Sequence, residues 1–184
     1  MPKTAVVILA EGFEEVEAIA PVDVLRRAGV RVTIAGATER QVKSSRQIGV
    51  QTDILLRELK EMPDAVILPG GIPGATNLAK SQEVGEFVKK MNAAGKIVAA
   101  ICAAPAAVLA PLGILNGKKA TCYPGCEEDF KPGTVPSKDR VVEDGNLITS
   151  QGPGTALEFA LVIAARLAGR AMAENVRGKM LIPS

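Results

Sequence analysis

The sequence predicts a doubly wound α/β domain, in which a mostly parallel sheet carries helices on both faces. Short runs rich in Val and Ile alternate with longer helical runs. Several of the short runs are apolar at every position, which is typical of strands covered on both faces. The length of 184 residues, with 47% hydrophobic and 23% charged residues, suits one folded domain over residues 1–184.

Each helical run is followed by a glycine, the residue that most readily ends a helix in a left-handed conformation. These glycines are Gly29, Gly95, Gly113 and Gly169. The strands are expected at 5–10, 30–35, 65–68, 96–101 and 147–150, and the helices at 14–28, 84–94, 103–112 and 155–168.

A ligand site is expected in the loops after the strands, because ligands of doubly wound sheets bind beyond the carboxyl ends of the strands. Thr155, which follows one such loop, is the expected N-cap of the last helix. Residues 118–142 depart from the alternation. They are rich in Gly, Pro and charge, and we expect an excursion with short strands around 120–123 and 140–142.

The charge balance gives no sign of a nucleic acid or a membrane surface as partner. There are 22 Lys and Arg against 20 Asp and Glu, a net charge of +2, and no run of like charge. No apolar run reaches the roughly 18 residues of a membrane span. The first run, at 5–10, is too short for a signal peptide and lacks its cleavage site, so a cytoplasmic location is expected.

Histidine is absent from the chain, which excludes Ser-His and Cys-His nucleophiles and histidine metal ligands within one chain. The three cysteines, Cys102, Cys122 and Cys126, form no regular framework and are expected as free thiols in a reducing compartment. Cys122 and Cys126 do not make the four-ligand set of a structural zinc site. We therefore expect no metal and interpret these two as exposed spare thiols.

Cys102 stands between the expected strand 96–101 and the expected helix 103–112, a strand-nucleophile-helix arrangement. Such a sharp turn needs small residues two positions away on either side, and Ala100 and Ala104 meet that need. The start of the helix would direct N–H groups and the positive dipole end at the sulfur, so a lowered thiol pKa is expected. The alternative is that Cys102 is a small buried hydrophobe.

Gly70 and Gly71 follow the expected strand 65–68 at the same edge of the sheet. Glycines there allow backbone N–H groups to approach a ligand closely. If the N–H groups of Gly71 and Ala103 converge near Cys102, they form an oxyanion hole for an addition intermediate. The alternative is an ordinary turn.

Glu17 is an acid of the first helix that is expected to face inward. It shares a helical stripe with Ala20, Pro21 and Val24, whereas Glu14 lies in the first turn, where acids interact with the helix dipole. Burial raises a carboxyl pKa, so Glu17 is expected to stay protonated near neutral pH and to donate a hydrogen bond to an adjacent thiolate. The alternative is a carboxylate that turns to water or caps a loop.

Five segments, in order and with matching spacing, resemble the DJ-one branch of the ThiJ/PfpI superfamily. The resemblance runs from about residue 4 to about residue 170, and it implies a flavodoxin-like sandwich and a homodimer. The segments are AEGFEEVE at 10–17, PVDVLRRAG at 21–29, LPGG at 68–71, AAICAAP at 99–105 and SQGPGT at 150–155.

The resemblance also assigns roles to the candidate catalytic residues. The nucleophilic, oxidation-prone cysteine of the family falls on Cys102 and its protonated acid partner on Glu17. The oxyanion-type amides fall on Gly71 and Ala103.

Five further residues are expected around the pocket. Glu14 and Gly70 are two of these pocket residues, and Arg46 matches an arginine that the family brings toward the partner subunit's site. Pro153 falls in a loop that does likewise. Several close members carry a histidine near the thiol where this chain has Tyr123.

The resemblance suggests a cysteine-dependent, cofactor-independent enzyme of the glyoxalase or deglycase type, acting on small 2-oxoaldehydes such as methylglyoxal or on glycated groups. Cys102 would add to the aldehyde, and Glu17 would move a proton within the adduct before water releases a hydroxyacid. Peptidase chemistry lacks its histidine base, and turnover is expected to be slow. The alternative is an oxidative-stress sensor or redox-regulated chaperone, in which Cys102 is oxidised to sulfinate without turnover.

Overall fold

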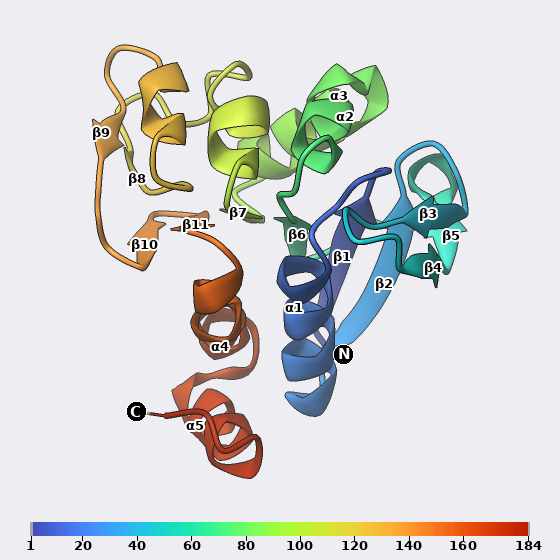
Figure 1. Cartoon of the computed structure of the whole chain (residues 1–184). Helices are drawn as coiled ribbons and strands as arrows, with labels where there is room; N and C mark the ends of the chain where they lie inside the picture. The colour runs from blue at the N-terminus through green and yellow to red at the C-terminus, as the bar shows by residue number, and fades with distance from the viewer. Residues whose placement is uncertain (1, 184) are drawn as a thin grey trace.

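The central strands are so apolar that neither face of the sheet can be left to water. In this computed structural model, which describes residues 2–183, β1 (Thr4–Leu9), β6 (Ala65–Leu68) and β7 (Ile97–Ile101) are buried along almost their whole length. β6 pairs in parallel with both β1 and β7. Helices cover both faces (Figure 1). The predicted doubly wound architecture is confirmed.

Seven strands form the main sheet, in the order β10-β11-β7-β6-β1-β2-β5. β10 (Val141–Asp144) runs antiparallel to β11 (Leu147–Ser150), and the other neighbours pair in parallel. From β1 the chain passes to β2 (Arg31–Gly36) and β5 (Ile54–Leu55) on one side, then returns to β6 on the other. The strand order therefore reverses between β1 and β6, where sheets of this kind bind their ligands.

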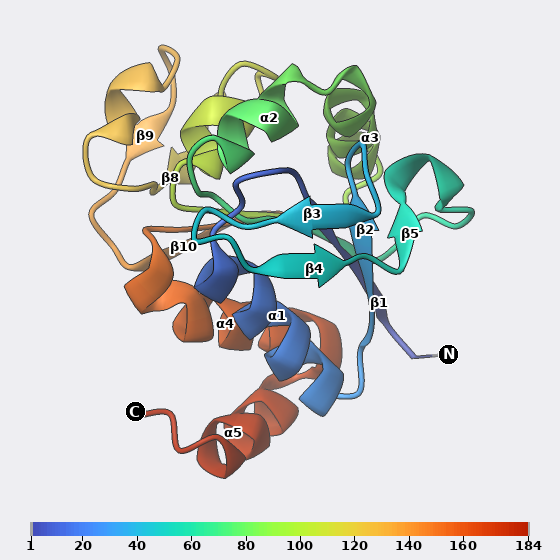
Figure 2. The same ribbon diagram turned by 45° about the vertical axis from the view of Figure 1, so that its right-hand side comes forward.

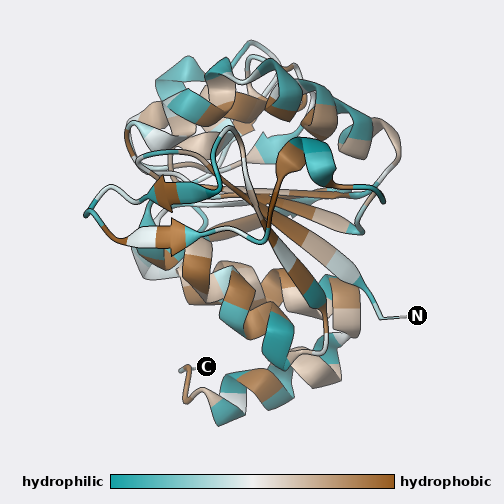
Figure 3. Cartoon of the chain, turned by 90° about the vertical axis from the view of Figure 1, so that its right-hand side faces the viewer, coloured by the Kyte–Doolittle hydropathy of each residue, from teal (hydrophilic) through white to brown (hydrophobic). Residues whose placement is uncertain are grey.

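Two helical layers enclose the sheet. α1 (Glu15–Arg27), α4 (Ala156–Ala168) and α5 (Arg170–Lys179) lie on one face, and α2 (Gly74–Lys80) and α3 (Gln82–Ala93) lie on the other (Figure 2). Each layer closes its own hydrophobic cluster against the strands. Figure 3 shows the apolar strands between the two layers. Among residues 2–183, no helix is long and apolar enough to cross a membrane.

Shorter elements occupy the connections between these layers. They comprise the hairpin β3 (Gln41–Lys43) and β4 (Gly49–Gln51), the pair β8 (Lys119–Ala120) and β9 (Val135–Pro136), and the short helices η1 (Leu56–Glu58), η2 (Pro105–Leu109), η3 (Cys126–Asp129) and η4 (Pro153–Thr155).

The structure corrects three local expectations. The helix expected at 103–112 is a short π-helix, η2, in which the Ala110 N–H donates to the Pro105 carbonyl five residues back at 3.0 Å. The strand expected around 120–123 shrinks to β8. The strand expected around 140–142 is β10 and joins the main sheet as its antiparallel edge.

Candidate active site

Cys102 lies on the sharp turn that joins β7 to η2. Its φ is 64°, a left-handed conformation that residues other than glycine rarely adopt. Two main-chain hydrogen bonds hold it there: its N–H donates to the Ser150 carbonyl at 3.0 Å, and the Tyr123 N–H donates to its carbonyl at 2.8 Å. Ala100 and Ala104 are fully buried and let strand and helix pack closely. Strain held in place by its neighbours is typical of functional positions.

Glu17 lies in the first turn of α1, and it is fully buried as its helical stripe predicts. Its Oε2 accepts a hydrogen bond from the Gly70 N–H at 2.8 Å. Its Oε1 has no hydrogen-bond partner among residues 2–183. Glu14, a predicted pocket residue, is the N-cap of α1, and its Oε2 accepts the Glu17 N–H at 2.8 Å. The helix start is thereby fixed, and one oxygen of the buried acid is left available.

The thiol and the acid influence each other's ionisation. Burial raises the pKa of Glu17 to about 7. The Cys102 thiol and the Gly70 N–H have the opposite effect and lower this pKa. Burial also raises the pKa of Cys102 to about 12, and the negative charge of Glu17 adds to the rise. The N–H groups of Gly71 and Ala103 lower it. At pH 7 Glu17 is therefore about half protonated while the Cys102 thiol keeps its proton, and the two titrations belong to the pair rather than to either group.

The expected lowering of the thiol pKa is wrong. It rested on a ten-residue helix whose dipole ends at the sulfur, whereas η2 spans only Pro105–Leu109. Two local amides, at Gly71 and Ala103, favour the thiolate, and they are outweighed first by burial of the thiol and then by the charge of Glu17. Both amides lower the pKa of the Cys102 thiol, and their role as an oxyanion hole stays a prediction.

Glycines make the close approach of the loops possible. A Cβ placed on Gly70 would lie 2.6 Å from Cys102 Cβ and 2.8 Å from Glu17 Oε2. Gly71 has a φ of 89°, and a Cβ there would lie 2.5 Å from the Glu14 nitrogen. Only residues without a side chain allow the loop after β6 to pass between the acid and the thiol.

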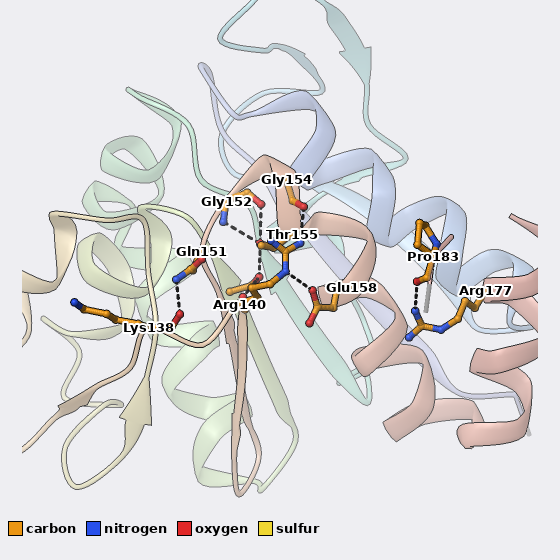
Figure 4. Close-up of polar contacts among 10 residues, drawn as sticks. Lys138, Arg140, Gln151, Gly152, Gly154, Thr155, Glu158, Arg177 and Pro183 are labelled. Atoms are coloured by element: carbon orange, nitrogen blue, oxygen red, sulfur yellow. Dashed lines mark hydrogen bonds and ion pairs between the residues drawn. The ribbon is translucent and has the colours of Figure 1, made fainter. Parts of the chain in front are cut away.

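The loop after β11 forms a third wall, which Gly152 brings close to the acid. A Cβ on Gly152 would lie 3.3 Å from Cδ2 of Tyr123 and 4.0 Å from Glu17 Oε1. The Thr155 hydroxyl fixes the loop: it donates to the Gly152 carbonyl at 2.8 Å and accepts the Gly152 N–H at 3.1 Å (Figure 4). It also lies 2.7 Å from Ser150 Oγ.

Thr155 is the N-cap residue of α4, but its side chain bonds to this loop and not to the helix. Gly152 is not singled out by the sequence as a site residue. The sequence signal that could have identified Gly152 is its position in the SQGPGT segment, which carries part of the family resemblance.

Arg46 and Pro153 lie apart from the buried thiol and acid. Arg46 is exposed in the turn between β3 and β4, where its Nη1 donates to Ser45 Oγ at 3.2 Å. Pro153 is exposed at the start of η4. Among the described residues, no hydrogen bond joins either to the acid or the thiol. Their service to a partner subunit's site stays a prediction.

Glu15 fastens this turn to α1, a role that its position in a first helical turn did not indicate. Its Oε1 accepts hydrogen bonds from Ser44 Oγ at 2.6 Å and the Arg46 N–H at 2.8 Å, and Oε2 accepts from Ser45 Oγ at 3.3 Å. Burial opposes ionisation, but these bonds prevail and lower the Glu15 pKa. The hairpin consequently lies against the start of α1 (Figure 2).

Cys122 and Cys126 are unpaired, as expected, but the expectation that both are exposed is wrong, because Cys122 is buried and Cys126 is half-buried. Burial, Cys126 and the acids Glu127 and Asp129 raise the pKa of Cys122 to about 12. Within residues 2–183, no group of three or more Cys, Asp and Glu side chains is arranged to hold a metal ion.

A family model described as the DJ-1/PfpI family matches residues 3–166. This chain belongs to the DJ-1/PfpI family. Protein dj-1beta of Drosophila melanogaster is 44% identical over 185 residues, covering 99% of this chain and 98% of the relative. Its crystal structure superposes with a TM-score of 0.96 over the whole of both chains. The resemblance found in the sequence is confirmed at the level of family and fold.

Two further members of the DJ-1/PfpI family bear on function. The "Glutathione-independent glyoxalase DJR-1.2" of Caenorhabditis elegans is 38% identical over 170 residues, covering 91% of this chain and 90% of the relative. A structure of oxidised DJ-1 from Toxoplasma gondii has a TM-score of 0.95 at 35% identity, and it covers 99% of this chain and 100% of that one.

Proposed function

We propose that this chain is a cysteine-dependent, cofactor-independent glyoxalase or deglycase-type enzyme that acts on small 2-oxoaldehydes or glycated groups. The observation that carries the proposal is the buried Glu17, whose raised pKa lies near 7 and whose Oε1 lacks a partner beside the Cys102 thiol. A general base works best when its pKa lies near the working pH. The activity named for the Caenorhabditis elegans relative supports this choice.

The first step joins the thiol to the aldehyde. As sulfur attacks the aldehyde carbon, the Glu17 carboxylate takes the thiol proton and then passes it to the aldehyde oxygen. The thiolate thus forms during attack, because the free thiol has a pKa of about 12 while Glu17 is charged. The N–H groups of Gly71 and Ala103 favour negative charge on the adduct.

The second step is an internal oxidation and reduction. Glu17 takes the proton from the carbon that bears sulfur and returns it to the neighbouring ketone carbon, while the hydroxyl proton of the adduct moves to the ketone oxygen, so the first carbon becomes a thioester and the second an alcohol. Water then cleaves the carbon–sulfur bond, and the products are the hydroxyacid and the free thiol. No external oxidant or reductant enters, since the electrons move between adjacent carbons of one substrate.

Lactate formation from methylglyoxal, in buffer without glutathione, tests this proposal. We expect slow but protein-dependent production of lactate. The absence of lactate at high protein concentration, from protein shown to be folded by circular dichroism, would remove the enzymatic proposal.

The second candidate is a redox sensor or redox-regulated chaperone that uses the same thiol. The oxidised state of the Toxoplasma gondii relative favours it. Oxidation of Cys102 to sulfinate consumes two molecules of peroxide and adds two oxygens. Mass spectrometry after mild peroxide treatment distinguishes the candidates, because selective oxidation without lactate formation supports the sensor.

We also propose a cytoplasmic homodimer that needs neither nucleic acid nor membrane. Val16 and Ile19 on α1 and Ile48 in the β3–β4 turn are exposed apolar side chains on neighbouring elements, a pattern typical of association surfaces. Arg46 lies in the same turn as Ile48. A partner subunit packed against these apolar side chains would therefore have this Arg46 near its own site. Sedimentation equilibrium tests the dimer, and V16D should shift it toward monomer.

A further inference from the structure

Tyr123 and Gly152 form one wall beside the catalytic acid. A single methyl-sized position, the Cβ that Gly152 lacks, lies 3.3 Å from Cδ2 and 3.7 Å from Cε2 of Tyr123. The same position lies 4.0 Å from Glu17 Oε1, the oxygen without a hydrogen-bond partner. The ring edge of Tyr123 therefore stands directly against the loop that borders the reacting proton.

Hydrogen bonds to the main chain hold both parts of this wall. The Tyr123 N–H donates to the Cys102 carbonyl at 2.8 Å, and its own carbonyl accepts the Cys126 N–H at 2.9 Å. Thr155 holds Gly152 through both its N–H and its carbonyl. The backbone of Tyr123 is thus held by a hydrogen bond to Cys102, and that of Gly152 by Thr155.

The residues that flank Tyr123 and Gly152 in the chain line a cavity, although neither Tyr123 nor Gly152 lines it itself. A cavity of about 340 Å³ is lined by Cys122 and Pro124, which flank Tyr123 in the chain, and by Gln151, which precedes Gly152. Phe130 and Pro136 add apolar surface, and the lining also includes Glu127, Ser137 and Lys138. Its size falls within the range of small-molecule sites, and it has room for an aromatic ring.

We propose that Tyr123 and Gly152 limit the size of the substituent that an aldehyde substrate carries, and that Tyr123 acts through the volume of its ring rather than through its hydroxyl. The side chain is 50% exposed, and it is the ring edge, at Cδ2 and Cε2, that meets the Gly152 position. The proposal rests on the proposed function and names its substrate class: 2-oxoaldehydes with a substituent no larger than a methyl or similar group.

Selectivity between methylglyoxal and phenylglyoxal tests the wall. Y123A should raise kcat/KM for phenylglyoxal relative to methylglyoxal by about tenfold or more, the usual scale for steric selection in an apolar pocket. Y123F keeps the ring and should leave this ratio within about twofold of wild type. G152A should lower it, because the added methyl narrows the gap, and the backbone there is extended, so alanine brings no conformational strain. An unchanged ratio in Y123A, or an equal rise in Y123F, would overturn the proposal.

Alkylation of Cys102 provides a readout that needs no turnover. Mass spectrometry gives its rate with iodoacetamide and with the bulkier N-phenyl analogue, and Y123A should favour the bulkier reagent. If wild-type protein turns over neither aldehyde, the proposed function fails. The ratio of the two alkylation rates still tests whether Tyr123 limits the size of what reaches Cys102. If turnover is present but neither ratio moves in Y123A, the wall fails and the proposed function stands.

Discussion

Cys102 and Cys122 are both largely shielded from water, and the pKa of each thiol is raised to about 12, yet their neighbours differ in kind. Beside Cys102 the opposing charge is Glu17, a buried acid whose own pKa lies near 7. Beside Cys122 the charges are Glu127 and Asp129, which are exposed to solvent. A proton transfer to Glu17 therefore removes the charge beside Cys102, although not the larger effect of burial, whereas neither acid beside Cys122 is buried.

The comparison teaches that burial alone does not make a cysteine reactive or inert. Cys102 has amides of Gly71 and Ala103 that favour its thiolate, together with an acid able to accept its proton. No amide contributes to the pKa of Cys122 in this way. A buried thiol such as Cys102 becomes reactive when a neighbouring group, here Glu17, can accept its proton and thereby lose its own charge.

Replacing each cysteine in turn gives the largest expected effect. C102S should reduce lactate formation by at least about a thousandfold, because the covalent step is lost. C122S should keep most of the activity, since no step passes through that sulfur. Steady-state assays of both variants at matched protein concentration check this, and comparable losses in the two would erase the distinction between the thiols.

Removal of the charge on Glu17 should separate turnover from ionisation. E17Q should lower turnover by about a hundredfold to ten-thousandfold, the range for one lost acid-base group. The same change should speed alkylation of Cys102 at pH 7.5 by about tenfold or more, because the thiol no longer faces a carboxylate. Peptide mass spectrometry after iodoacetamide measures this, with Cys122 as the internal control. Slower alkylation in E17Q would mean that the acid assists the resting thiolate.

The raised pKa of Glu17 also makes stability depend on pH. The folded state holds this proton up to about pH 7, whereas the unfolded chain releases it near 4.5. The stabilisation is complete below about pH 4.5 and is lost as the pH rises through 7, in total roughly 3 kcal/mol. Urea unfolding measures this effect. Between pH 5 and pH 8 the free energy of unfolding of wild type should fall by most of this amount, whereas that of E17Q should not fall by it. A parallel decline in both proteins would place the titration elsewhere.

The smallest expected effect concerns the other thiol. E127Q removes one exposed charge near Cys122 and should raise its alkylation rate at pH 8 by less than about fivefold, because exposed charges interact weakly. The rate at Cys102 should not change. An increase as large as that of E17Q at Cys102 would show that the two thiols are governed alike.

Most of the fold could be predicted because its signals are local. Continuous apolar runs predicted β1, β6 and β7. The glycines that follow the helical runs predicted the helix ends to within a few residues. The β3–β4 hairpin was missed because its strands are three residues long and depend on contacts with Glu15 and the segment around Phe13. The π-helix at 105–109 was missed because its apolar residues do not distinguish it from an α-helix.

The candidate site was predicted in part for the same reason. A nucleophile turn and an inward-facing acid are visible as spacing, so Cys102 and Glu17 could be named from the sequence. The sign of the thiol pKa shift could not, because it depends on how burial and a neighbouring charge compare with two amides. Gly152 enters the site only through the folding of a distant loop.

Tyr123 is the only tyrosine of a chain that contains no tryptophan. Its phenol is consequently the dominant source of intrinsic fluorescence, and its ring lies against Gly152, which borders Glu17, with no brighter emitter to mask it. A titration of unlabelled protein with an aldehyde should therefore change an optical signal that originates at a single known ring.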